Sequence, residues 1–101
     1  MYREKIIEVV FENINNLLDT FPENEKFSVS EETVLFGFGS QIDSLSLVSV
    51  IVDLEMHYSM ELNIEFSLTD DRAMTRKISP FDSVKNLVDY IHELLIETSN
   101  Q

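Results

Sequence analysis

The chain of 101 residues contains no cysteine and no tryptophan, and only two glycines and two prolines. Without cysteine it can form neither a disulfide framework nor a thiolate metal site. No run approaches the roughly 18 consecutive apolar residues of a membrane span. The first five residues begin an amphipathic pattern rather than the apolar core of a signal peptide. These absences predict a cytoplasmic protein that is not inserted into a membrane.

Positive charge is also scarce, since 7 lysines and arginines face 19 acidic residues and the net charge at pH 7 is −12. No lysine or arginine occurs between Phe27 and Asp71, whereas acidic residues recur throughout that stretch. Such a field repels nucleic acids and anionic membranes, and it attracts proteins with basic surfaces. We therefore expect basic protein partners, no nucleic-acid partner and, because of self-repulsion, a monomer. Solubility alone is the alternative explanation of the same charge.

The apolar spacing predicts a single all-α domain over residues 1–101. Recurrence at three and four residues predicts helices over 2–20, 44–59 and 81–97, and a short helix near 69–75 capped by Ser67 or Thr69. The expected fold is a four-helix bundle of three longer helices and one short third helix, with a long first loop over 23–42. Residues 98–101 are expected to form a flexible polar tail.

The ends of these elements are predicted from local signals. Ser79 and Pro80 are expected to start the last helix, as its cap and its first residue. Residues 28–31 have the form of a capping box and predict a short helical turn near Glu31. Strand propensity in 27–29 and 62–66 opposes the all-α prediction.

The helix predicted over 44–59 carries two apolar stripes. One face is lined by Val50, Ile51, Leu54 and Tyr58, and a neighbouring face by Leu45, Val48 and Val52. A bundle this small does not easily bury both faces. One of the two stripes is therefore a candidate contact surface for a partner, and burial of both stripes between helices is the alternative.

The stretch over 39–45 (GSQIDSL) places one serine hydroxyl at the start of that helix. Asp43 has the right type and position to cap the helix, and Ser44 then becomes its first residue. A phosphodiester on Ser44 would lie at the positive end of the helix. No histidine base lies near in sequence, so a serine enzyme would lack the groups it needs. Plain helix capping is the alternative reading of the Asp-Ser pair.

Two groups of residues resemble the acyl carrier protein family over most of residues 35–95. The attachment region of that family is similar to Gly39, Ile42, Asp43, Ser44, Leu45, Val48, Val50, Ile51, Leu54 and Glu55. The fourth-helix pattern of that family is similar to Phe81, Ser83, Val84, Leu87, Tyr90 and Ile91.

The resemblance implies that Ser44 carries 4′-phosphopantetheine, taken from coenzyme A by a phosphopantetheinyl transferase. Asp43 would orient the site, with Leu45 beside it. Acyl-loading and acyl-transferring enzymes would dock on a surface formed by Leu45, Val48, Val52, Asp53 and Glu55. A carrier of this family is not itself an enzyme, so no catalytic residue is expected, and the inner helix walls would shelter the cargo.

Some residues depart from the pattern of the family. Ser46, Ser49 and Met56 stand where carriers of bacterial fatty acid synthesis usually have acids, and residues 68–79 are longer and more basic than is typical. These departures predict a stand-alone carrier of a specialised pathway, such as saccharide modification or a secondary metabolite. An aminoacyl or peptidyl carrier is one alternative. An unmodified acidic adaptor, which binds a partner helix through the stripe of Leu45, Val48 and Val52, is another.

The remaining polar residues predict no metal site. His57 and His92 lack metal-ligand spacing, and the acidic pair at 70–71 does not match a calcium loop. Arg72 and Arg76 are four residues apart. They would either approach the prosthetic phosphate or a carboxylated cargo, or pair with nearby acids such as Asp70 or Glu65.

Overall fold

The computed structural model describes residues 2–99, and within that range the chain is helical and has no strand. The elements are α1 (Arg3–Leu18), the short 3₁₀ helix η1 (Glu23–Glu25), α2 (Ser44–Leu62), α3 (Asp71–Met74) and α4 (Val84–Ser99). Extended pairing is limited to one isolated antiparallel bridge between Val34 and Ser83. The prediction of an all-α fold with three long helices and a short third one is confirmed.

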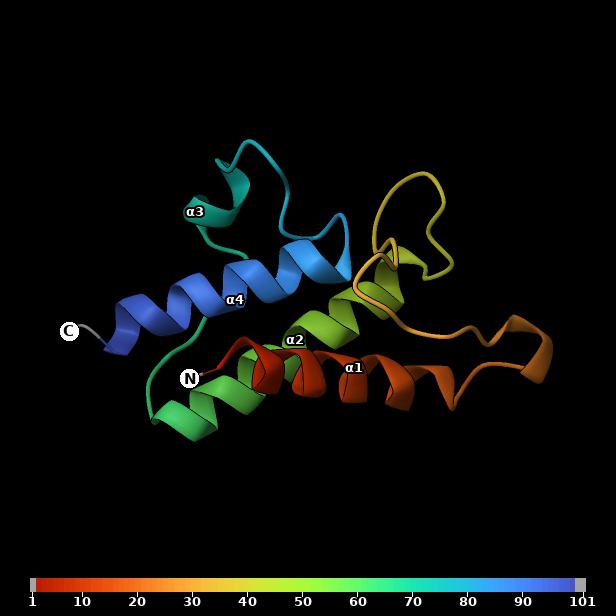
Figure 1. The fold of residues 1–101 in the computed structure, drawn as a ribbon, viewed down its shortest axis with the longest axis horizontal. Helices are drawn as coiled ribbons and strands as arrows, with labels where there is room; N and C mark the ends of the chain where they lie inside the picture. The colour runs from red at the N-terminus through yellow and green to blue at the C-terminus, as the bar shows by residue number, and fades with distance from the viewer. Residues whose placement is uncertain (1, 100–101) are drawn as a thin grey trace.

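Helix α1 packs against both α2 and α4, and in Figure 1 α3 lies on the side of α4 that faces away from α1. The core draws residues from every α-helix and from the first loop. From α1 it takes Ile6, Val10, Ile14 and Leu18, and from α4 Val84, Leu87, Val88, Tyr90, Ile91 and Leu95. Burial of this apolar surface is the main force that holds the helices together.

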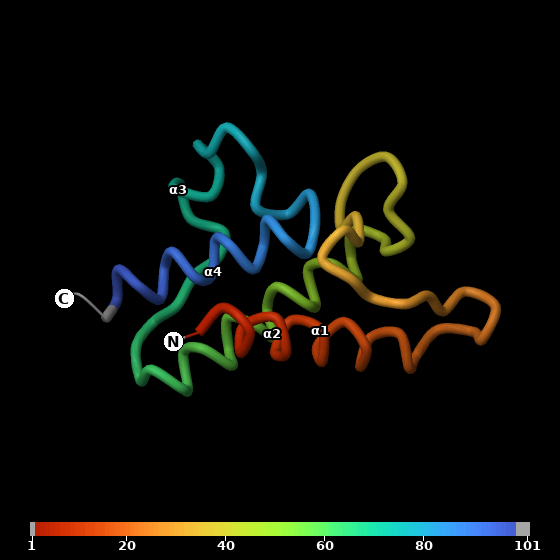
Figure 2. Tube along the Cα trace, viewed as in Figure 1, coloured from red at the N-terminus to blue at the C-terminus, as the bar shows by residue number. Residues whose placement is uncertain are grey.

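The first loop is tied to the start of α4 by backbone hydrogen bonds. Leu35 N–H donates to Asp82 at 3.0 Å, and Val84 N–H donates to Thr33 at 3.0 Å. The guanidinium of Arg3 joins the same region, because it binds Glu31 at 2.6 Å in the loop and Asp89 at 2.8 Å in α4. Figure 2 shows the long path of the loop from the end of α1 to the start of α2. These bonds fix the point from which the chain enters α2.

Two helix starts differ from the prediction. Asp70, and neither Ser67 nor Thr69, caps α3, since its Oδ1 accepts the N–H of Ala73 at 3.3 Å. Helix α4 begins at Val84 rather than near Pro80, and the Ser83 hydroxyl accepts the N–H of Asn86 at 3.2 Å. The reason is the tie to the first loop: the Asp82 carbonyl accepts the Leu35 N–H, and Ser83 forms the bridge with Val34, so the helix starts only at Val84.

Other boundaries shift by a few residues. Helix α1 ends at Leu18 rather than at residue 20, and α2 continues to Leu62, where Asn63 adopts a left-handed conformation (φ 54°). Helix α4 runs through Ser99, so the first two residues of the expected tail are helical, and residues 100–101 lie outside the described range.

The turn expected near Glu31 is present, but it neither continues into a helix nor contains the expected capping box. Residues 30–33 form a single turn, in which Thr33 N–H donates to the Ser30 carbonyl at 3.2 Å. The carboxylate of Glu31 binds Arg3 instead of closing a capping box. The only short helix found between 19 and 43 is η1. Within residues 2–99, no helix combines the length and the apolar character that crossing a bilayer requires.

Candidate functional site

Ser44 is the first residue of α2 and its side chain is exposed. Asp43 precedes it in extended conformation and caps the helix, because its Oδ1 accepts the N–H of Ser46 at 2.7 Å. The hydrogen bond from Ser46 lowers the pKa of the Asp43 carboxyl below its usual value. The capping position predicted for Asp43 is thus confirmed, and the Ser44 hydroxyl is left outside the backbone ladder.

The loop before the site is shaped by a hydroxyl that sequence reasoning missed. The Ser40 Oγ lies 2.9 Å from the carbonyl oxygen of Leu35 and 2.8 Å from that of Ile42, and it accepts the Ile42 N–H at 3.1 Å. Gly37 and Gly39 have φ values of 94° and 90°, which favour glycine. Because Ile42 is buried, the loop delivers Asp43 and Ser44 to a fixed place on the core. The tendency of a serine hydroxyl to bond nearby backbone groups in a turn could have pointed to Ser40.

An apolar hollow of about 360 Å³ opens beside Ser44. It is lined by Phe36, Ser44, Leu47, Val48, Ile51, Met74, Ser79 and Phe81. These residues come from the first loop, α2, α3 and the turn that precedes α4. No charged side chain lines the hollow, so it suits an apolar chain and offers little to an ionic one.

The two apolar stripes of α2 have opposite fates. Val50, Ile51, Leu54 and Tyr58 are buried. The second stripe is exposed, with 79% of Leu45, 53% of Val48 and 44% of Val52 accessible. Burial of this stripe between helices is therefore excluded. Sequence reasoning missed one further member, Met56, which follows Val52 by one helical turn and is also exposed.

The two acids expected at the docking surface differ in their surroundings. Asp53 is exposed, whereas Glu55 is partly buried. The Glu55 carboxylate accepts the N–H of Leu68 at 2.7 Å and so anchors the chain that leaves α2. Glu55 has an internal structural partner that the sequence pattern did not reveal.

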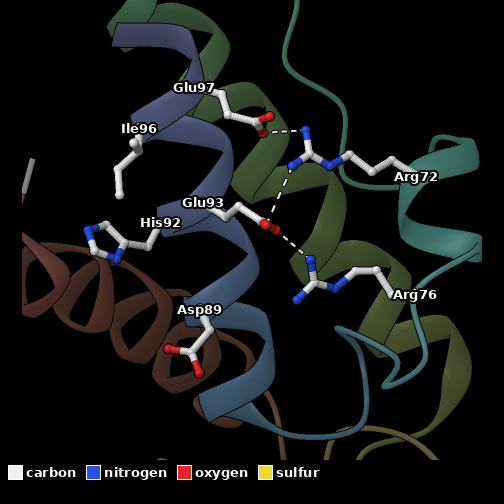
Figure 3. Close-up of a pocket in the computed structure, with 7 residues that line it drawn as sticks. All are labelled: Arg72, Arg76, Asp89, His92, Glu93, Ile96 and Glu97. Carbon is white, nitrogen blue, oxygen red and sulfur yellow. Dashed lines mark hydrogen bonds and ion pairs between the residues drawn. The ribbon is translucent and has the colours of Figure 1, made fainter. Parts of the chain in front are cut away.

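Arg72 and Arg76 do pair with acids, but the partners lie in α4. Figure 3 shows the guanidinium of Arg72 between Glu93 and Glu97, and that of Arg76 beside Glu93. The expected partners were wrong, because Asp70 caps α3 and accepts the hydroxyl of Tyr90 at 3.3 Å. Neither arginine lines the hollow beside Ser44.

Neither histidine lines the hollow beside Ser44. His57 is 13 residues further along α2, which corresponds to roughly 20 Å of helix. His92 lines the shallow depression that also holds Arg72 and Arg76. Across residues 2–99, no three His, Cys, Asp or Glu side chains cluster in a way that could hold a metal ion.

No protein-family profile matches the chain, and neither a curated protein nor a solved structure matches it.

Proposed function

We propose that this chain is an acyl carrier protein, which holds acyl intermediates as thioesters on a 4′-phosphopantetheine arm attached to the Ser44 hydroxyl. A phosphopantetheinyl transferase would join the Ser44 oxygen to the phosphate nearest the pantetheine in coenzyme A. The phosphoanhydride bond would break, adenosine 3′,5′-bisphosphate would leave, and the serine proton would pass to a base of the transferase. The chain itself supplies the acceptor and no catalysis.

The observation that carries this proposal is an exposed serine at the first residue of a helix, beside an apolar hollow. The phosphodiester would sit at the positive end of α2, where a negative charge gains about 0.3–1 kcal/mol. The Asp43 carboxylate is already engaged by Ser46, so the helix start is held while the Ser44 hydroxyl stays accessible. The groups present therefore fit the arm.

The lining of the hollow favours an acyl cargo over an aminoacyl or peptidyl one. Phe36, Ile51 and Phe81 offer apolar contact, and no carboxylate lies in the lining to balance an ammonium group. Burying an unpaired charge there would cost several kcal/mol, so a charged aminoacyl group would stay in solvent.

The surface of α2 supports a specialised pathway. Ser49 and Met56 are exposed at places where carriers of bacterial fatty acid synthesis usually have acids, so a partner that reads those charges would find none. In a pathway-exchange assay we expect the modified chain to support fatty acid elongation poorly. Elongation as efficient as that of the housekeeping carrier would overturn this part of the proposal.

Intact-mass measurement tests the attachment directly. The parent chain, Ser44→Ala and Ser46→Ala are each incubated with coenzyme A and a broad-specificity phosphopantetheinyl transferase. Ser46 lies in the same helical turn and is the matched control. We expect a gain of one phosphopantetheine unit in the parent and in Ser46→Ala, and none in Ser44→Ala. No gain in a folded parent chain with several transferases would overturn the carrier proposal.

A second candidate function is an unmodified acidic adaptor, and the exposed stripe of Leu45, Val48, Val52 and Met56 favours it. Apolar surface of this kind is typical of a helix that binds a partner. In that case Leu45→Arg would abolish partner binding, while Ser44→Ala would have no effect on the activity of the pathway. The carrier proposal expects Ser44→Ala to be inactive.

A further inference from the structure

The segment of residues 69–79, here called the α3 segment, forms one wall of the hollow. Met74 and Ser79 from this segment line the hollow together with Ser44 and Leu47. Helix α3 has only four residues, and a helix that short is not stable by itself in water. The position of this wall must therefore be set by what attaches the segment to the rest of the molecule.

Few apolar contacts attach the α3 segment. Ala73 is the one buried residue of α3, and Met74 and Ile78 are 69% and 65% exposed. A single alanine contributes little buried apolar area. The Tyr90 hydroxyl, which donates to Asp70 at 3.3 Å, adds one polar contact from α4.

Ion pairs to α4 also attach the segment, beside a hydrogen bond of 3.5 Å from the Asn86 amide to the Ser79 carbonyl. Arg72 binds Glu97 and lies 3.6 Å from Glu93, and Arg76 binds Glu93 as well (Figure 3). The guanidinium of Arg76 also lies 4.9 Å from the centre of the Tyr90 ring. The hydrogen bond to Glu97 raises the pKa of Arg72 above its ordinary value. Both arginines and both glutamates are partly open to solvent, so dissolved ions can reach them.

We propose that Arg72, Arg76, Glu93 and Glu97 form an ionic latch, which holds the α3 segment against α4 and thereby controls access to the hollow beside Ser44. Releasing the latch lets the segment move away, which opens the hollow on the side of Met74 and uncovers the surface beneath Ala73. Salt, or a charged surface of a partner, releases it by competing for the same groups. The inference rests on the proposed function only in taking the hollow as the cargo site.

The same charges do not form an anion-binding site. Three acids, Asp89, Glu93 and Glu97, line the depression together with Arg72 and Arg76. Both arginines already have carboxylate partners, so a phosphate would have to displace an acid that stays nearby. The geometry therefore points to a mechanical role for these side chains.

Hydrogen exchange of single amides measures the latch in the unmodified chain. The N–H groups of Ala73, Met74 and Thr75 bond to carbonyl oxygens at residues 70 and 71, so their exchange reports the opening of α3. Two double variants are compared on a Ser44→Ala background, namely Arg72→Gln/Arg76→Gln and Glu93→Gln/Glu97→Gln. They change the net charge in opposite directions but remove the same pairs.

We expect both double variants to exchange these three amides about 3- to 10-fold faster, as loss of exposed ion pairs predicts. The N–H of Leu47, which bonds to Asp43 at 3.0 Å in α2, should keep its rate. Lys26→Gln is the matched control, because it breaks an exposed pair with Glu23 far from α3 in sequence. Binding of the neutral dye Nile red should rise about 3-fold in the two double variants and stay unchanged in Lys26→Gln.

Two further measurements, one in the parent chain and one with a charge swap, test the latch without the double Gln variants. In the parent chain, raising sodium chloride from 0.05 to 0.5 M should speed exchange at Ala73, Met74 and Thr75 but not at Leu47, because the Debye length falls to a few ångströms. The charge-swap variant Arg72→Glu/Glu97→Arg can form the ion pair in the opposite direction. Its amide hydrogen exchange at α3 should therefore be slower than that of Arg72→Glu alone. Unchanged rates at α3 in the double variants and in salt would overturn the latch, whether or not the chain accepts phosphopantetheine.

Discussion

Helix α2 presents two apolar stripes that look alike in sequence and behave differently in the structure. The inner stripe of Val50, Ile51, Leu54 and Tyr58 is buried against the rest of the core. The outer stripe of Leu45, Val48, Val52 and Met56 is exposed, and it begins one residue after Ser44. Exposed apolar residues are therefore concentrated beside the proposed attachment site. The inner stripe is part of the core, whereas the outer stripe is left open to solvent.

Truncation of the inner stripe should have the largest effect. Leu54 is fully buried, so Leu54→Ala loses transfer free energy and leaves a cavity, at a cost of about 2–5 kcal/mol in the free energy of unfolding. Met56→Ala, two residues further on the outer stripe, should change it by less than about 0.5 kcal/mol. Urea unfolding followed by circular dichroism measures both. An equal loss of unfolding free energy in Leu54→Ala and Met56→Ala would show that the two stripes do not differ in their contribution to stability.

A charge on the outer stripe should affect recognition without affecting the fold. Leu45→Arg places a cation beside Ser44, and we expect kcat/KM of the transferase for this chain to fall about 30-fold, because an interface hot spot is worth about 2 kcal/mol or more. The free energy of unfolding should stay within about 0.5 kcal/mol of the parent, because Leu45 is mostly exposed. Modification at the parental rate would show that the transferase does not read this stripe.

Asp53 and Glu55, two of the acids of α2, sharpen the comparison. Glu55→Ala removes the acceptor of the Leu68 N–H and should cost about 1 kcal/mol of stability. Asp53→Ala is the matched control, because this exposed acid makes no hydrogen bond to residues 63–99, and its stability cost should be near zero. The reverse order of the two costs in urea unfolding would contradict the structural role of Glu55.

The cap at the start of α2 predicts a dependence of stability on pH. Folding lowers the pKa of Asp43, so the carboxylate stabilises the native state above its unfolded pKa of about 3.9, and this contribution is lost as the pH falls through the lower, folded pKa. Asn also caps helices well, so Asp43→Asn should be nearly as stable at pH 7 and should lose less stability than the parent by pH 3. An equal loss of stability in the parent and in Asp43→Asn between pH 7 and pH 3 would contradict the lowered pKa of Asp43.

The smallest effect is expected at the inner stripe itself. The hydroxyl of Tyr58 is buried, and among the described residues it finds no hydrogen-bond partner, while burial raises its pKa to about 12. Tyr58→Phe removes this unsatisfied group and keeps the ring, so the free energy of unfolding should be unchanged or rise by up to about 1 kcal/mol. Thermal unfolding measures the change. A clear loss of stability would mean that the hydroxyl has a partner in solution.

The sequence predicted the helices better than their ends or their surroundings. Spacing of three and four residues located α2 and both of its stripes, because that period belongs to the helix alone. It could not tell which stripe is buried, since packing against α1 decides that. Likewise Ser79 and Ser83 both have the form of a cap, and only the pairing of residues 33–35 with 82–84 selects Ser83.

In the candidate site too, features set by neighbouring residues were predicted and features set by tertiary contacts were not. The Asp43 cap and the exposed Ser44 depend on neighbouring residues and were predicted. The hollow, the anchoring of Leu68 by Glu55 and the partners of Arg72 are formed by residues far apart in the chain, so no local pattern specifies them.

Locating the added group within the modified chain tests the central claim most directly. Because no lysine or arginine lies between Phe27 and Asp71, trypsin releases residues 27–72 as one peptide that contains the whole site. Fragment-ion mass spectrometry of this peptide, after treatment with coenzyme A and a transferase, assigns the added mass to one residue. The account predicts a single phosphopantetheine group on Ser44. An unmodified peptide, or the group on any other serine, would contradict it.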